Sequence, residues 1–224
     1  MLMYHNVGYE PADRGTILPS ELASQWRSLQ RLGYANVSMD QIRRHLAAGT
    51  LPEGRNFAIT FDDGRRGVYE HGLPLLQSFG YTATVYVVPG LTGTTRWFSG
   101  HALTYMSLDQ IRLWAAAGQS VGSHTLTHQH LPCLGEPELR REIVDSARTL
   151  ENQLDIAGGA MHFAYPYGEY ERRVEEAAAT CHATAVTVEQ GAVRPSSRLM
   201  AIPRVDPGRR RDEMIVRFAN LGLL

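Results

Sequence analysis

Two short polar clusters contain residue types that can carry out acid–base or metal chemistry. The first is Asp62-Asp63-Gly64, which follows the apolar stretch Ala58-Ile-Thr-Phe61, and the second is Ser123-His-Thr-Leu-Thr-His128. His124 and His128 are four residues apart, which places both rings on one face of a helix or of an extended segment. On a helix their Cβ atoms would be ~5–6 Å apart, a separation that lets two imidazoles bind one metal ion at ~2.0–2.1 Å.

The paired carboxylates need a special backbone to act together. Neighbouring side chains of a regular strand face opposite sides, so Asp62 and Asp63 can share a site only where the strand ends and the chain turns. Asp-Gly is also a common turn, and a helix-capping role is about equally favoured on this pair alone. The histidine pair favours chemistry, because two histidines and one carboxylate leave open metal positions for water, as in catalytic sites. We interpret His130 as a loop residue near the site.

Alternating short strands and amphipathic helices must position these clusters. The expected strands are 1–4, 57–61, 84–88, 120–123, 161–165, 182–187 and 199–203. Leu22, Trp26, Leu29 and Leu32 predict the buried face of one helix, and further helices are expected at 66–79, 136–156, 170–180 and 211–221. Ser38-Met-Asp-Gln41 and Ser107-Leu-Asp-Gln110 have the form of capping boxes, and the helices after them should end at Gly49 and Gly118.

This alternation predicts one α/β domain over residues 1–224 with a parallel sheet. Seven strand signals fit a barrel better than an open sheet. In such barrels the active site lies at the carboxyl ends of the strands, where Asp62-Asp63 and His124 are expected.

Three motifs in this order resemble the polysaccharide deacetylase family, also called carbohydrate esterase family 4. They are Thr60-Phe-Asp-Asp-Gly64, Ser123-His-Thr-Leu-Thr-His128 and Phe163-Ala-Tyr-Pro-Tyr-Gly168. Leu2-Met-Tyr-His5 and Ala201-Ile-Pro-Arg-Val205 resemble the branch that includes the biofilm poly-N-acetylglucosamine deacetylases. The resemblance extends over nearly the whole chain.

The resemblance implies a distorted (β/α)7 barrel and a metal-dependent hydrolase that removes N-acetyl or other short N-acyl groups from an amino sugar. The sugar would belong to a polysaccharide or a glycan precursor. The resemblance also implies that Asp63, His124 and His128 bind a divalent metal, commonly zinc, with cobalt or nickel as alternatives. Asp62 would be the general base, and the backbone N–H of Tyr167 would stabilise the oxyanion.

The sequence departs from the commonest family pattern at two places. Ala164 stands where many members have an arginine, and Arg204-Val-Asp206 stands where they have a late histidine. We expect His5, at the end of the first strand, to be the general acid, because its ordinary pKa suits proton donation near neutral pH. The alternative is a histidine packed under the barrel rim. We expect Arg204 to orient Asp62 in place of the missing arginine.

Other functions stay open at this stage. One alternative is a deformylase or amidohydrolase of a lipid- or nucleotide-linked sugar or of a small cyclic amide, and another is a non-catalytic carbohydrate-binding descendant. The loop 89–100 should border the mouth, where Trp97 and Phe98 offer flat faces for a sugar ring. An equally favoured interpretation is a hydrophobic plug over the rim.

Composition excludes several classes of protein. The formal net charge of −1 argues against nucleic-acid binding, and no apolar run approaches the ~20 residues of a transmembrane segment. The N-terminus lacks a secretory signal, so we expect a cytoplasmic protein as the sequence stands, or an exported one if a leader had been removed. Cys133 and Cys181 form no metal-type pair, and we expect both to be buried small hydrophobes.

Overall fold

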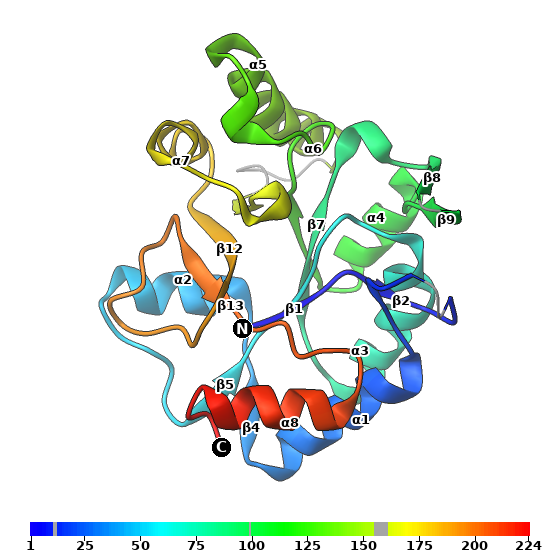
Figure 1. The fold of residues 1–224 in the computed structure, drawn as a ribbon, viewed down its shortest axis with the longest axis vertical. Coiled ribbons are helices and arrows are strands. Elements are labelled where there is room, and N and C mark those ends of the chain that lie inside the picture. Colours follow the sequence, from blue (N-terminus) through cyan, green and yellow to red (C-terminus); the bar gives the residue numbers. More distant parts are fainter. Residues whose placement is uncertain (11–12, 99, 155–160) are drawn as a thin grey trace.

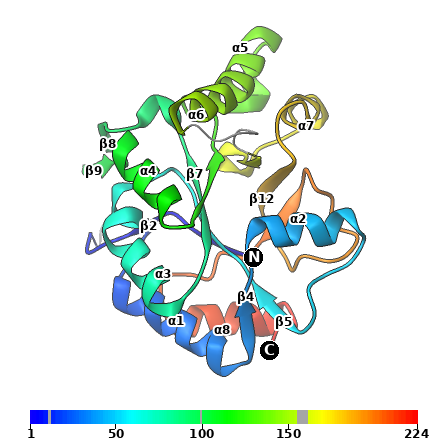
Figure 2. The same ribbon diagram turned by 180° about the vertical axis from the view of Figure 1, so that it is seen from behind.

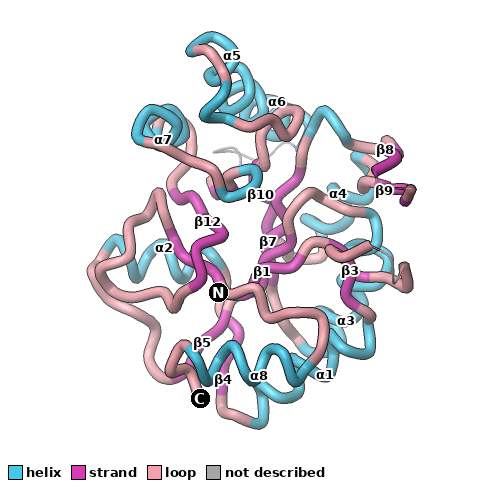
Figure 3. The backbone as a smooth tube through the Cα atoms, in the orientation of Figure 1, coloured by secondary structure: helices cyan, strands magenta, loops and turns pink. Residues whose placement is uncertain are grey.

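A sheet of seven parallel strands forms the centre of the molecule, and Figures 1 and 3 show its strands inside the layer of helices. The computed structural model describes residues 1–10, 13–98, 100–154 and 161–224. The strands lie in the order β1-β6-β7-β10-β11-β12-β13, and every neighbouring pair is parallel. Their bounds are β1 (Leu2–Tyr4), β6 (Ile59–Phe61), β7 (Ala83–Val87), β10 (Ser120–Ser123), β11 (His162–Ala164), β12 (Thr184–Gln190) and β13 (Ile202–Arg204).

Backbone bonds bring the two edges of this sheet together. Leu2 and Val205 form a parallel bridge, in which Met3 N–H donates to the Val205 carbonyl at 2.9 Å and Val205 N–H donates to Met1 at 2.7 Å. The barrel is irregular, because β10 and β11 pair at a single position, Ser123 with Phe163. A seven-stranded parallel sheet that nearly closes on itself confirms the expected distorted (β/α)7 barrel.

Helices surround the strands on the outside, as the two opposite views in Figures 1 and 2 show. Their bounds are α1 (Pro19–Arg31), α2 (Met39–Ala47), α3 (Leu73–Phe79), α4 (Leu108–Ala116), α5 (Glu136–Arg140), α6 (Ser146–Leu154), α7 (Arg172–Ala179) and α8 (Arg211–Asn220). Both predicted capping boxes form, at Ser38 and Ser107. Gly49 and Gly118 adopt the left-handed conformation just after the helices that they were expected to end.

Two of the predicted helices contain π-helical turns. The helix expected at 66–79 begins with η1 (Val68–Gly72) before α3, and the one expected at 136–156 has η4 (Arg141–Asp145) between α5 and α6. Residues 155 and 156 of that prediction lie outside the described residues. Periodicity predicts helix but does not distinguish a local π turn from an α turn. Insertions of this kind often occur at functional sites.

The helix layer packs on the barrel through apolar side chains that the sequence pattern predicts. Leu22, Trp26 and Leu29 of α1 are fully buried and belong to the main core cluster, together with Phe61 of β6 and Trp114 of α4. The rings of Phe61 and Trp114 meet edge to face at 6.2 Å. Burying each such side chain contributes about 1.5–3 kcal/mol, which fixes the strand that precedes Asp62.

Three two-stranded sheets were not predicted from the sequence. They are β2 (Asn6–Val7) with β3 (Thr16–Ile17), β4 (Tyr34–Asn36) with β5 (Arg55–Phe57), and the antiparallel pair β8 (Thr95–Phe98) with β9 (His101–Thr104). Trp97 and Phe98 of β8 are 77% and 68% exposed. The interpretation of these rings as a hydrophobic plug is therefore wrong, because the hairpin holds them away from the core.

The prediction of two buried cysteines is also wrong. Both are free thiols, Cys133 is exposed and Cys181 is half-buried. Cys133 ends the short 3₁₀ turn Leu131–Cys133, in which Leu131 takes the buried position. Among the helices of the described residues, none is both long and apolar enough to cross a bilayer.

Candidate active site

The side chains singled out in the sequence gather at the carboxyl ends of the central strands. This is the end where barrels of this class hold their active sites. Asp62 and Asp63 follow β6, and His124 directly follows β10. The other candidates are His5 after β1, Tyr167 in the turn after β11, and Arg204 at the end of β13.

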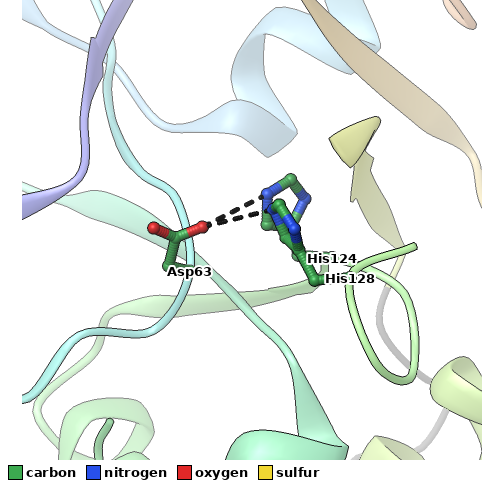
Figure 4. A group of neighbouring side chains, drawn as sticks. All are labelled: Asp63, His124 and His128. Atoms are coloured by element: carbon green, nitrogen blue, oxygen red, sulfur yellow. Dashed lines mark ion pairs between the residues drawn. The ribbon is translucent and has the colours of Figure 1, made fainter. Parts of the chain in front are cut away.

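Asp63, His124 and His128 form a compact cluster, shown in Figure 4. The Asp63 Oδ1 atom lies 3.6 Å from His124 Nε2 and 3.5 Å from His128 Nε2. One ligand atom from each of the three residues lies within 4.8 Å of the others. His130, the weaker candidate, is absent from this cluster of described residues. Its Nδ1 instead contacts Glu169 at 2.8 Å.

Left-handed backbone conformations bring these side chains to one point. Asp63, Thr125, His128 and Tyr167 are the four non-glycine residues of the described chain with positive φ, and all four lie at this site. Asp63 has φ 71° and Gly64 has φ 70°, so the chain turns sharply after β6. The turn removes the strand alternation that would otherwise separate Asp62 from Asp63. Such conformations cost about 1–3 kcal/mol each and persist where the surroundings enforce them.

The cluster fits a divalent metal in both geometry and protonation. A tetrahedral zinc with bonds of ~2.1 Å separates neighbouring ligand atoms by ~3.4 Å, close to the distances from Asp63 to the two rings. His124 Nδ1 lies 2.7 Å from the Ala164 carbonyl. A protonated Nδ1 donating to this carbonyl leaves the Nε2 lone pair facing Asp63. Burial, followed by the charge of His124, lowers the pKa of His128 to about 4. The His128 ring is therefore neutral near pH 7, as metal binding requires.

Asp62 is held by Arg204 and not by the cluster. Two guanidinium nitrogens of Arg204 donate to the two Asp62 carboxylate oxygens, both at 2.7 Å. Arg204 is fully buried, and it also donates to the Thr187 carbonyl at 2.8 Å and to Thr60 Oγ1 at 3.1 Å. Burial alone would raise the pKa of the Asp62 carboxyl, but the charge and hydrogen bonds of Arg204 hold it well below its usual range. Asp62 is therefore a buried, ionised and oriented carboxylate.

His5 lies beside Asp62 at the end of β1. The Asp62 N–H donates to the Tyr4 carbonyl at 2.9 Å, which ties the two strand ends together. His5 is half-buried, and its charge contributes to lowering the pKa of the Asp62 carboxyl. It is not part of the three-residue cluster found in the described chain.

Tyr167 covers the other side of the histidine pair. It lies in the turn Pro166–Gly168 with φ 59°, and its side chain is half exposed. Its ring meets His128 edge to face at 4.6 Å and stacks on His130 at 3.9 Å with an interplanar angle of 6°. His130 therefore contacts the site through the Tyr167 ring, close to where the sequence places it.

Sequence reasoning missed the groups that orient the predicted residues. Thr60 Oγ1 donates to the Leu2 carbonyl at 2.8 Å and accepts from Arg204. The carbonyls of Ala164 and Thr187 fix His124 and Arg204. Every residue has a backbone carbonyl, so residue identity does not show which carbonyls will make these contacts. Thr60 could have been found, because it belongs to the motif Thr60-Phe-Asp-Asp-Gly64. His162 is the first residue of β11 and so lies at the end of the strand away from the site. Its Nδ1 atom is hydrogen-bonded to the Thr184 hydroxyl at 2.8 Å.

Comparison with known proteins identifies relatives of this chain. The polysaccharide deacetylase family model matches residues 51–186. YxkH of Bacillus subtilis (strain 168), which is named as a member of the polysaccharide deacetylases, is 27% identical over 92% of this chain and 70% of its own length. The poly-beta-1,6-N-acetyl-D-glucosamine N-deacetylase of Escherichia coli (strain K12) is 38% identical over 37% of this chain, a match to 12% of that protein.

Solved structures agree as well. IcaB from Ammonifex degensii superposes with a TM-score of 0.85 at 25% identity, covering all of this chain and 96% of that one. The Streptococcus pyogenes deacetylase PplD has the same fold, with a TM-score of 0.83 at 24% identity over 96% of both chains. Because the family model covers more than half of the sequence and its motifs meet at one barrel mouth, the chain belongs to the polysaccharide deacetylase family.

Proposed function

We propose that this protein is a metal-dependent N-deacetylase of an amino sugar in a polysaccharide or glycan precursor, with residues 1–224 forming one catalytic domain. The observation that supports this most is that two neighbouring carboxylates contact different groups. Asp63 faces two histidine nitrogens, whereas its neighbour Asp62 is paired with Arg204. The site therefore offers one metal ligand and one oriented base next to each other.

In this proposal Asp63, His124 and His128 hold a divalent metal, with zinc as the first choice and cobalt or nickel as alternatives. When bound, the metal supplies Lewis-acid chemistry, polarising the amide carbonyl and acidifying a water molecule. Asp62, the neighbour of the proposed ligand Asp63, would accept the proton of the attacking water. Arg204 keeps the Asp62 carboxylate ionised and fixes its direction.

The remaining steps use Tyr167 and His5. The water oxygen adds to the amide carbon, and the backbone N–H of Tyr167 donates to the oxyanion that forms. The C–N bond then breaks, and His5 protonates the departing amine. One water is consumed, one carboxylic acid and one free amine are released, and the proton held by Asp62 returns to His5 to restore the starting state. His5 suits donation because an imidazolium ring carries a transferable N–H proton and because it stands on the Asp62 side of the site.

The exposed hairpin is a proposed binding surface for sugar rings. Its base joins the site directly, since Met106 N–H donates to the Gly64 carbonyl at 2.9 Å and Tyr105 bridges with Arg65. Trp97 and Phe98 of β8 present flat aromatic faces to solvent. The relatives named for poly-N-acetylglucosamine deacetylation make an N-acetylglucosamine polymer the first substrate to test.

A panel of N-acyl donors tests this function. Zinc-loaded protein should release acetate from β-1,6-linked N-acetylglucosamine oligomers faster than it releases formate from an N-formyl amino sugar. It should leave small cyclic amides intact. Preference for the formyl or cyclic substrate would replace the deacetylase with the related amidohydrolase, and sugar binding with no turnover of any donor would indicate a carbohydrate-binding descendant.

A further inference from the structure

The loop that carries His124 and His128 is held by a helix outside the site. Thr125 and His128 both have φ 64°, so the segment contains two unfavourable left-handed turns within four residues. One hydrogen bond within the loop runs from His128 N–H to Thr125 Oγ1 at 3.0 Å, whereas Leu126 and Thr127 bond to neighbouring elements. Contacts from neighbouring elements must therefore fix the two metal-facing rings.

Glu142 supplies three of these contacts. Its carboxylate accepts two hydrogen bonds from Thr127, one from the backbone N–H at 2.8 Å and one from the hydroxyl at 2.6 Å. Its backbone carbonyl accepts from Leu126 N–H at 2.9 Å. Glu142 is only 4% exposed, so this is a buried carboxylate with both oxygens used by a single loop residue.

The π-helical turn η4 explains how one residue can make all three bonds. In an α-helix the N–H of Ser146 would donate to the carbonyl of Glu142, four residues earlier. Here it donates to Ile143, and the Glu142 carbonyl accepts from Leu126 outside the helix. The widened turn thus presents the carbonyl and the carboxylate of the same residue to the loop.

The opposite side of the loop is held by a close backbone approach. Gly90 N–H donates to the Leu126 carbonyl at 2.8 Å, and a Cβ at Gly90 would lie 2.5 Å from that oxygen. Leu126 is therefore fixed from both sides, by Gly90 and by Glu142. Ser123, just before His124, is tied to the same helix by a 2.7 Å bond between its hydroxyl and that of Ser146.

We propose that Glu142 is a positioning residue for the metal site: it holds the His124–His128 loop in the conformation that binds the ion. The inference rests on the proposed metal site and extends it to a residue that belongs to a separate helix. Loss of a group that orients metal ligands commonly costs ~10–100-fold in metal affinity. The π turn is then part of the site, because a regular helix would point one of the two Glu142 groups elsewhere.

The test is metal affinity, measured by chelator competition on the metal-free protein with zinc, alongside its thermal unfolding. Glu142→Ala should weaken zinc binding at least ~10-fold. Glu142→Gln should stay near wild type, because the amide can accept from the Thr127 N–H and donate to its hydroxyl. The matched control is Glu151→Ala, an exposed carboxylate of α6 whose removal should change nothing. If Glu142→Ala does not fold, Thr127→Val tests the proposal in its place, because it removes only the hydroxyl donor. It should also weaken zinc binding.

The outcomes separate this inference from the proposed function. Unchanged zinc affinity in Glu142→Ala or Thr127→Val, with or without a lower unfolding temperature, would show a structural role only and overturn the proposal. A Gln variant as weak as the Ala variant would overturn the hydrogen-bond explanation. If the wild-type protein binds no zinc, the metal-dependent function fails and this inference fails with it.

Discussion

Arg204 and Asp62 form a two-point ion pair inside the barrel, with both nitrogen–oxygen distances at 2.7 Å. The two residues are 142 positions apart in the sequence. They come together because β13 and β1 close the sheet and β6 lies next to β1. The pair therefore links the closure of the barrel to the orientation of the proposed base.

Breaking this pair should destabilise the protein. Arg204→Met leaves Asp62 buried without a partner and should lower the free energy of unfolding by about 3–5 kcal/mol. The double variant Asp62→Asn with Arg204→Met should cost less than the sum of the single variants, because neither charge is then left alone. Denaturant unfolding of the metal-free variants measures this coupling. Strictly additive losses would mean that the two side chains do not depend on each other.

Asp62 should be needed for turnover and not for metal binding. Asp62→Asn should keep one metal per chain but lose at least ~100-fold in turnover, the usual scale for a positioned acid or base. Asp109→Asn is a suitable control, because that carboxylate is exposed on α4. Retention of activity in Asp62→Asn would place the base elsewhere.

His5 should act only on substrates whose leaving group needs a proton. His5→Ala should bind metal normally and hydrolyse activated esters far better than N-acetyl amides, because an activated ester leaves as a stable anion. Comparing kcat on the two substrate types measures the effect, with His45→Ala on the outer helix α2 as the control. Equal losses on esters and amides would remove His5 from the proton-transfer step.

The aromatic hairpin should contribute to binding of long substrates. Trp97→Ala should raise KM several-fold for an N-acetylglucosamine oligomer while kcat changes little, and it should not affect a small activated ester. Val216→Ala, an exposed apolar side chain on α8, is the matched control. The same KM for the oligomer in Trp97→Ala and in wild type would show that the ring contributes nothing to substrate binding.

The sequence predicts the barrel well because its signals are local. Each of the seven central strands overlaps a segment expected from the sequence to be a strand, and Ser38 and Ser107 form the capping boxes that their spacing implies. Asp63, His124 and His128 could be grouped in advance because strand ends of a parallel barrel meet at one mouth and the histidine spacing places both rings together. The choice of Asp63 rather than Asp62 as the metal ligand came from the resemblance to the polysaccharide deacetylase family.

Other features depend on contacts that no short segment encodes. The bonds from Glu142 to Thr127 require a π turn, which has the same residue pattern as an α-helix. The contact between the Ala164 carbonyl and His124 cannot be predicted from residue identity, because every residue has a backbone carbonyl. The β8–β9 hairpin was missed although the dipeptide Ser-Gly separates its two strands in the sequence, because neither Thr95–Phe98 nor His101–Thr104 shows the polar–apolar alternation of a strand. Cys133 is exposed because Leu131 fills the core beside it.

Acetate release from an N-acetylglucosamine oligomer, measured before and after metal removal, tests the central claim most directly. Chelated wild-type protein should lose activity and regain it with one equivalent of zinc, and His124→Ala should bind less than one equivalent and stay inactive. Full activity of the chelated protein, or unchanged metal stoichiometry and turnover in His124→Ala, would contradict a metal-dependent deacetylase at this site.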